Sequence, residues 1–201
     1  MRSKDQRRKG KKRKPKTQLQ DLGKGFVIDF YPQGKSLSHR RSEDYNPLIV
    51  VITSEKFQFY DVVLTMGSKF FIGDDLLLSP RNRNILRISQ IHYDQLSSSA
   101  LSNLPTTIKK IVMTYESRFI RFLNQAHPLT SQMHQLQLLP GIGQKRLWAI
   151  LEARKTNSFS SFSDFSTRTN ISDPMSIFTN RILLELENSP KYYLFIKKVL
   201  V

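Results

Sequence analysis

The spacing of apolar residues changes near residue 95, and this change constrains the fold more than any other feature of the sequence. Residues 23–95 contain short runs rich in β-branched and aromatic side chains, separated by turn residues such as Pro32–Gln33–Gly34. Beyond residue 95, apolar side chains recur every three or four positions, as in Ile108, Ile111, Val112 and Tyr115. The pattern predicts an α+β protein in which strands precede helices.

Five short strands are expected in the first part, with no helix between them. In 57–65 both alternating sets of side chains are partly apolar, which is typical of a small curled sheet. The sequence therefore predicts a small OB-like β-barrel whose aromatic side chains lie mostly in the core. The expected strands are 25–32, 47–53, 56–65, 75–79 and 85–93.

The second part is expected to be helical. A short helix over 97–102 precedes a longer one that Pro105 opens and His127–Pro128 ends. Further helices are expected over 130–138, 144–155 and 158–165, with another starting at Asp173–Pro174 and a last strand or docking segment at 191–200. The predicted organisation is a basic arm (1–20), an OB-like barrel (21–96), connecting helices (97–128) and a helix-hairpin-helix domain with a C-terminal segment (129–201).

Charge is concentrated at the N-terminus. The chain carries 32 Lys and Arg against 16 Asp and Glu, a net charge of +16. Residues 1–16 hold ten cations and Asp5, which gives 10 − 1 = +9 and leaves +7 for the rest. Such a block repels itself and buries nothing, so it is expected to be a disordered arm that follows a polyanion. Its candidate binding residues are Lys9, Lys11, Lys12, Arg13 and Lys14. A solubilising tail is the alternative.

The stretch 138–148, "LLPGIGQKRLW", predicts a phosphate site. Glycines in the turn leave backbone amides free at the positive end of a following helix, where an anion binds. Cations in a first helical turn oppose the dipole, but a bound phosphate removes that conflict. The pattern is that of a helix-hairpin-helix motif, with an ordinary turn as the alternative. Its candidate binding residues are Pro140, Gly141, Ile142, Gly143, Gln144, Lys145 and Arg146.

Other cations extend the expected surface, and a second hairpin supports the first. The polar loop 33–46 contributes Lys35, Arg40 and Arg41, and the turn after the fourth strand contributes Arg81 and Arg83. The later connection "TNISDP" has no glycine. It is therefore expected to be a packing half that holds the first hairpin rigid.

Several stretches resemble the archaeal domain-of-unknown-function family 655. They are "LSNLPTTIKKIV", "ESRFIRFLNQAHPLTSQMHQLQLLPGIGQKRLWAILEARK", "FSSFSDF", "RILLELE…KYYLF" and "GFVIDFYPQG". The resemblance spans roughly 24–196 and implies an OB-like barrel joined to a helix-hairpin-helix domain with nucleotide or nucleic-acid binding. Family members tend to lie near translation genes, which implies an RNA or ribosome context. The chain departs from the family at Ser79–Pro80, where a glycine-lysine turn is usual.

Other chemistries are disfavoured. The chain lacks cysteine, which excludes disulfides and thiolate metal sites and fits a reducing, cytoplasmic location. The longest aliphatic run, 48–52, is too short to span a membrane. His127 and His134 lack clustered carboxylates, and no nucleophile motif is present.

We therefore expect a non-enzymatic protein without cofactor or metal that reads the phosphate backbone of nucleic acid, with RNA favoured over DNA and the ribosome a candidate partner. A DNA-binding or DNA-repair accessory protein is the first alternative. A protein–protein adaptor is the second, and an enzyme such as a nuclease the third.

Overall fold

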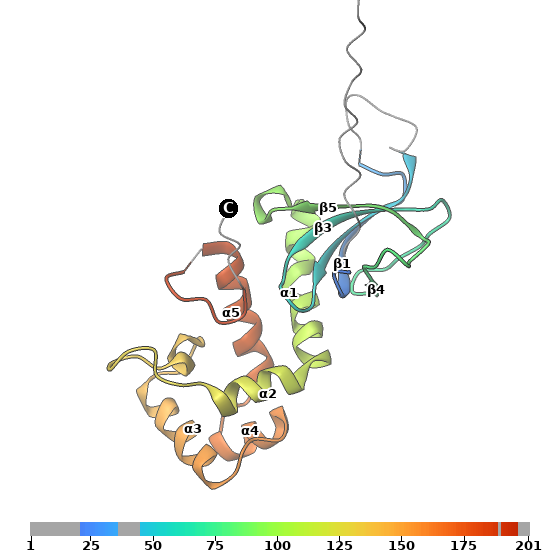
Figure 1. Cartoon of the computed structure of the whole chain (residues 1–201). Helices are drawn as coiled ribbons and strands as arrows, with labels where there is room; N and C mark the ends of the chain where they lie inside the picture. The colour runs from blue at the N-terminus through green and yellow to red at the C-terminus, as the bar shows by residue number, and fades with distance from the viewer. Residues whose placement is uncertain (1–20, 36–44, 189, 197–201) are drawn as a thin grey trace, which may run out of the picture.

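A curled antiparallel sheet forms the first part of the chain (Figure 1). The computed structural model describes residues 21–35, 45–188 and 190–196. Within them the strand order is β4-β1-β2-β3-β5, and each neighbouring pair is antiparallel. The expected α+β class, an OB-like barrel followed by helices, is confirmed. The strands are β1 (Lys24–Tyr31), β2 (Leu48–Thr53), β3 (Phe59–Leu64), β4 (Asp75–Leu77) and β5 (Ile85–Ile91).

Both faces of the sheet are apolar, because the two faces pack against different partners. Successive side chains of a strand point to opposite faces. One set, including Ile28, Val50 and Val63, joins the core that the sheet shares with the helices. The other set, including Val27, Val51 and Val62, packs inside the curl of the sheet itself. The whole of β2 is accordingly buried.

A bulge in β1 fastens the sheet to the helical part. The pairing register shifts between Val27 and Asp29, and Asp29 is only 6% exposed. Its carboxylate accepts hydrogen bonds from Ser97 Oγ (2.6 Å), Tyr31 Oη (2.6 Å) and Ser99 Oγ (3.1 Å). Burial alone would raise the pKa of Asp29, but these hydrogen bonds outweigh burial and lower it. The ionised carboxylate thus lies beside the first turn of the next helix, where a negative charge is stabilising.

The expected boundary at Pro105 is wrong. One helix, α1 (Ser98–Thr114), runs through Pro105, and the break comes instead at Tyr115, before α2 (Glu116–Gln125). A proline inside a helix removes one hydrogen bond to the carbonyl four residues earlier. That carbonyl belongs to Leu101, whose side chain is on the exposed surface of α1, so water can take the place of the lost donor.

Three further helices complete the helical part. They are α3 (Gln144–Thr156), α4 (Phe162–Thr169) and α5 (Pro174–Asn188), with short 3₁₀ turns η2 (Tyr93–Gln95) and η3 (Gln135–Leu138). Phenylalanines from α2, α4, α5 and the C-terminal segment meet in their core, for example Phe119 and Phe178 with ring centres 5.0 Å apart. The described part of the 191–200 segment, residues 191–196, docks against the helices, since Phe195 is buried there. None of the helices in the described ranges is both long and apolar enough to cross a membrane.

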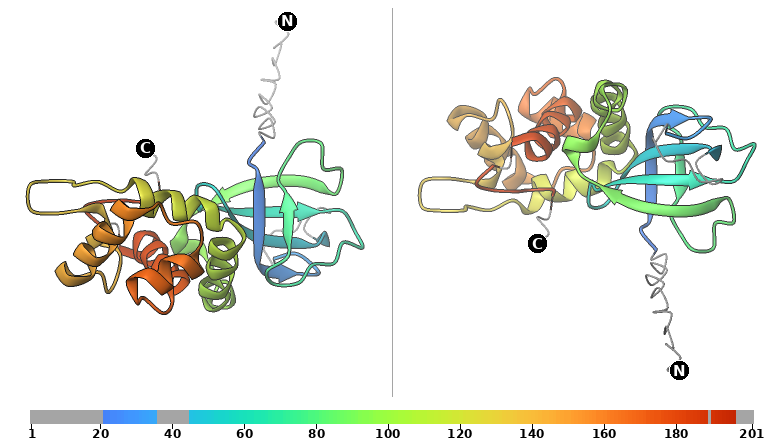
Figure 2. Two further views of the ribbon diagram at one scale, coloured as in Figure 1. Left: turned by 90° about the horizontal axis from the view of Figure 1, so that it is seen from below. Right: turned by 90° about the horizontal axis from the view of Figure 1, so that it is seen from above.

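Residues 130–134, the first half of the expected helix 130–138, are not helical, and residues 127–134 take another form. They form a loop that projects from the helical part (yellow in Figure 2), closed by an isolated bridge between Pro128 and His134. Only η3 remains helical, and Met133 is exposed rather than buried. Thr130 and Ser131 favour such local turns over helix, and the Thr130 hydroxyl accepts a hydrogen bond from the Gln132 amide.

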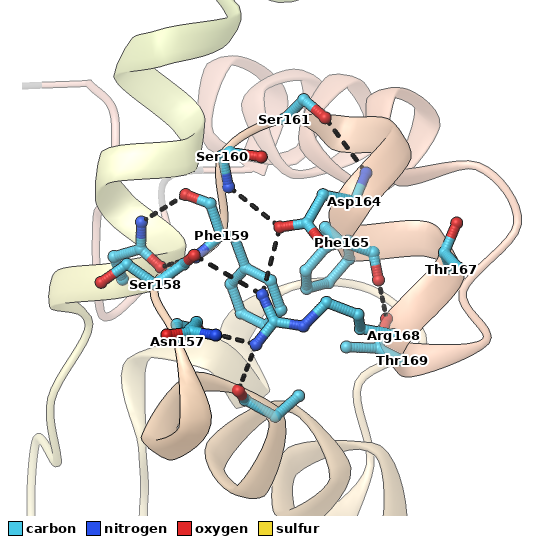
Figure 3. A network of polar contacts seen from close by, with 12 residues as sticks. Asn157, Ser158, Phe159, Ser160, Ser161, Asp164, Phe165, Thr167, Arg168 and Thr169 are labelled. Atoms are coloured by element: carbon cyan, nitrogen blue, oxygen red, sulfur yellow. Dashed lines mark hydrogen bonds and ion pairs between the residues drawn. The ribbon is translucent and has the colours of Figure 1, made fainter.

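Arginines take up carbonyls that helix ends leave free. Arg168 of α4 donates to the carbonyls of Ala153 and Asn157 at the end of α3, while its guanidinium lies 4.6 Å from the centre of the Phe159 ring (Figure 3). Arg154 does the same for α2, with Nη1 within 3.1 Å of the carbonyl oxygens of Leu123, Asn124 and Ala126. These contacts fix the angles between successive helices.

A buried ion pair in α5 anchors the start of the hairpin. Arg181 Nε lies 2.7 Å from Glu185 Oε1, and the two side chains are 6% and 0% exposed. Arg181 also donates to the carbonyl of Leu138 (3.1 Å), at the end of η3. Glu185 in turn accepts from the amides of Leu194, Phe195 and Ile196. One pair thus joins α5, η3 and the C-terminal segment.

We predict that Glu185→Ala lowers the free energy of unfolding by about 3–5 kcal/mol, because it leaves the buried Arg181 without a counter-charge. Urea denaturation of the full chain measures this. Glu152→Ala is the matched control: its pair with Lys155 is 63% and 69% exposed, so its loss should cost less than about 1 kcal/mol. Equal effects of the two substitutions would contradict the assigned role.

Candidate nucleic-acid interface

The predicted hairpin lies between η3 and α3. Gly141 has φ +81°, in the left-handed region that favours glycine, and Ile142 is buried between the helices. Gly143 follows in extended conformation as the N-cap of α3. The side chain of Ile142 therefore fixes the turn, while the exposed glycines on either side of it leave the backbone open.

Five backbone amides in and just after this turn have no hydrogen-bond partner among the described residues. Within the described part of the chain, the amides of Gly141, Gly143, Gln144, Lys145 and Arg146 form no hydrogen bond. The first amide of α3 that is bonded is that of Leu147, to the Gly143 carbonyl. A Cβ added at Gly143 would meet no atom within 4 Å, so the approach to these amides is open. Such a group of amides at a helix N-terminus suits an anionic oxygen.

The two cations that follow play different roles. Arg146 Nη1 donates to the Gly141 carbonyl at 2.8 Å, so its guanidinium supports the turn itself. The chain itself therefore provides a partner for Arg146, in addition to the phosphate that the sequence predicts there. Lys145 is exposed, and it forms no ion pair with any residue that the structure describes. Lys145 is therefore the cation that remains available to a ligand.

The second hairpin, between α4 and α5, has the same kind of turn, but an acidic residue follows it. Asn170 has φ +56°, in the place of Gly141, and Ile171 is buried as Ile142 is. Beyond it, however, Asp173 accepts hydrogen bonds from the Ser176 amide (3.0 Å) and hydroxyl (2.6 Å). These bonds lower the pKa of Asp173 despite some opposition from burial. A carboxylate of the chain thus already lies where an external anion would bind, which fits the expected packing role.

His134 lies at the start of η3, the 3₁₀ turn that leads into the hairpin. It is 7% exposed, and its Nδ1 accepts a hydrogen bond from the Leu136 amide at 3.1 Å. Burial, with the charge of Arg154 nearby, lowers the pKa of His134. The imidazole is therefore held neutral at the start of η3.

The remaining predicted residues that the structure describes lie away from the hairpin. Lys35 pairs with both carboxylate oxygens of Asp61 (2.9 and 3.0 Å) beside the Tyr31 ring. Arg81 and Arg83 are exposed in the turn between β4 and β5, at the end of the sheet away from the helical part (Figures 1 and 2). The other candidates, Arg40, Arg41, Lys9, Lys11, Lys12, Arg13 and Lys14, lie outside the described residues.

Sequence reasoning missed Trp148 on α3. Its side chain is 54% exposed, although Leu147 and Ile150 beside it are buried. The inward positions of the helix already indicate this, because at 100° per residue Trp148 falls about 130° from the middle of the stripe that Leu147 and Ile150 form. Separately, the described residues contain no group of three His, Asp or Glu side chains that could hold a metal ion.

The chain belongs to the protein family of unknown function DUF655, whose pattern it matches over residues 23–197. It is 30% identical over 176 residues to the uncharacterised protein MJ0038 of Methanocaldococcus jannaschii, covering 86% of this chain and 78% of that protein. The crystal structure of Af1531 from Archaeoglobus fulgidus, of the same family, is 32% identical and superposes with a TM-score of 0.78 over 87% of this chain and 99% of that one. The resemblance noted in the sequence is thereby confirmed.

We predict that protonation of His134 destabilises the fold. Because its pKa is lower in the folded than in the unfolded chain, the unfolded chain binds more protons just below pH 6.5, and stability falls as the pH drops through that range. Urea unfolding between pH 5 and 8 measures this dependence. The slope should diminish in His134→Asn, and an unchanged slope would assign the effect elsewhere.

Proposed function

We propose that this chain is a non-enzymatic nucleic-acid-binding protein that grips the phosphate backbone with the hairpin Pro140–Arg146. One observation supports the proposal above the others: the two hairpins share a turn, yet the second has a carboxylate of its own at the start of its helix and the first has none. In the second, the carboxylate of Asp173 takes up the Ser176 amide. The first instead offers five amides and Lys145, none of which has a partner among the described residues. Backbone amides and a lysine recognise phosphate without reading bases.

The charge of the chain supports a polyanionic ligand. A net charge of +16, with +9 in residues 1–16, gives an electrostatic attraction that does not depend on nucleotide sequence. RNA is favoured over DNA, because a basic arm preceding a small barrel is typical of ribosome-associated proteins. Phosphate contacts themselves do not distinguish the two sugars, so binding assays with matched RNA and DNA strands decide between them.

Gly143→Val combined with Lys145→Glu should weaken binding about tenfold or more, to a similar extent for every nucleotide sequence. The valine side chain would cover the open amides, and the glutamate would repel phosphate. Fluorescence anisotropy with labelled strands of several sequences measures the affinities.

The second hairpin provides the matched control for this variant. Ser172→Val places the same side chain after the buried Ile171, where Ser172 is exposed. It should leave the affinity unchanged. A loss confined to one nucleotide sequence would show base readout instead, and an equal loss in the control would refute the assignment of the hairpin.

Deleting residues 1–16 should flatten the dependence of binding on salt. Each phosphate contact contributes a slope of about −0.7 to −0.9 in log K against log salt. Removal of ten cations should therefore reduce the slope by several units, while binding through the hairpin remains. An unaltered slope would show that the arm does not contact the nucleic acid.

A further inference from the structure

Trp148 is the single tryptophan of the chain, and its exposure has no explanation within the fold. Its side chain is 54% exposed, in a helix whose inward positions are taken by Leu147 and Ile150. Among the described residues it makes no ring–ring or cation–ring contact, although nine aromatic pairs form elsewhere in the molecule. Single exposed apolar residues are common on protein surfaces, but an exposed aromatic ring next to a phosphate site can stack on a base.

Helix geometry places this ring next to the free amides of the hairpin. Trp148 lies one turn beyond Gln144, and its direction around the axis falls between those of Gln144 and Lys145. It is five residues from the N-cap Gly143, about 7.5 Å along the axis. Aromatic side chains of a helix point back toward its N-terminus and cover the preceding turn. We therefore expect the indole to lie over the first turn of α3, close to the amides and Lys145.

The surroundings of Trp148 suit a polyanion rather than an apolar protein surface. Lys145 is exposed and unpaired within the described residues, and Arg146 is exposed. The acidic neighbour on this face, Glu152, is neutralised by Lys155 at 2.6 Å. Aromatic rings beside cations are the elements that bind single-stranded nucleic acid, the ring stacking on a base while the cations meet the backbone.

We propose that Trp148 stacks on an unpaired base of an RNA strand whose phosphate lies on the hairpin amides. This inference rests on the proposed function and narrows its ligand to single-stranded RNA, or to a loop or bulge of a folded RNA. Bases inside a duplex already stack on their neighbours, and the deep, narrow major groove of an RNA helix keeps side chains out. A closed duplex would therefore leave the indole exposed.

The single tryptophan allows a direct test with the full chain. Three labelled RNA probes of about 12 nucleotides are compared: a single strand, the same strand with central bases removed, and the same sequence in a duplex. Anisotropy of the label measures binding, and the intrinsic fluorescence of Trp148 reports stacking. We expect the intact single strand to quench the fluorescence and to bind about 5- to 100-fold more tightly than the abasic strand.

Variants separate stacking from general binding. Trp148→Ala should weaken binding to the intact strand about 5- to 100-fold. The variant should then bind the intact strand about as tightly as the wild type binds the abasic strand. Its own affinity for the abasic strand should change little. Trp148→Phe should retain most of the affinity, since a phenyl ring also stacks. Met113→Ala, which shortens a side chain 58% exposed on α1, should change neither affinity.

The outcomes distinguish the two proposals. Binding of both single strands with equal affinity and no quenching would overturn the role of Trp148 while leaving the hairpin as a phosphate site. Tighter binding to the duplex than to the single strand would also overturn it. Absence of binding to all three probes would refute the proposed function, and this inference with it.

Discussion

The position of the hairpin depends on fully or partly buried guanidinium groups that donate hydrogen bonds to free backbone carbonyls. A helix leaves its last carbonyls without intrahelical partners, and burying them unpaired is costly. Arg154, Arg168 and Arg181 each reach carbonyls of another segment. Because one guanidinium can donate several hydrogen bonds in a fixed plane, each arginine sets the angle between two elements. Short helices without long apolar stripes can thereby hold a defined arrangement.

The two hairpins share a turn but differ in whether an acidic residue stands at the start of the following helix. Both bury an isoleucine, Ile142 and Ile171, after a residue with positive φ. In the second, Asp173 supplies the negative charge that a helix N-terminus favours, and its carboxylate accepts a hydrogen bond from the Ser176 amide. In the first, the corresponding charge is missing. A helix start without an acidic cap, followed by lysine and arginine, is better suited to an external anion.

Local patterns predicted the elements better than they predicted the connections between them. The strands were predictable because period-2 alternation and turn residues coincide, and the start of α5 because Asp173 and Pro174 combine two helix-start signals. Pro105 misled because its effect depends on whether the freed carbonyl reaches water. The loop 127–134 could not be derived, since its bridge between Pro128 and His134 requires the fold around it. The hairpin turn was found from its glycines, but Trp148 was overlooked because an exposed ring is identified only relative to its buried neighbours.

Sheet and helices share one core, in which Phe26 and Ile28 of β1 lie with Leu104 and Ile108 of α1. The hairpin at one end and the arginine-bearing turn at the other are consequently fixed to a single rigid frame. Any chain of nucleotides that touched both ends would have to follow the surface between them, so its curvature would have to match the distance between the hairpin and the turn. Such a ligand would be selected by its shape over the full length of the protein, which contact with one end alone could not do.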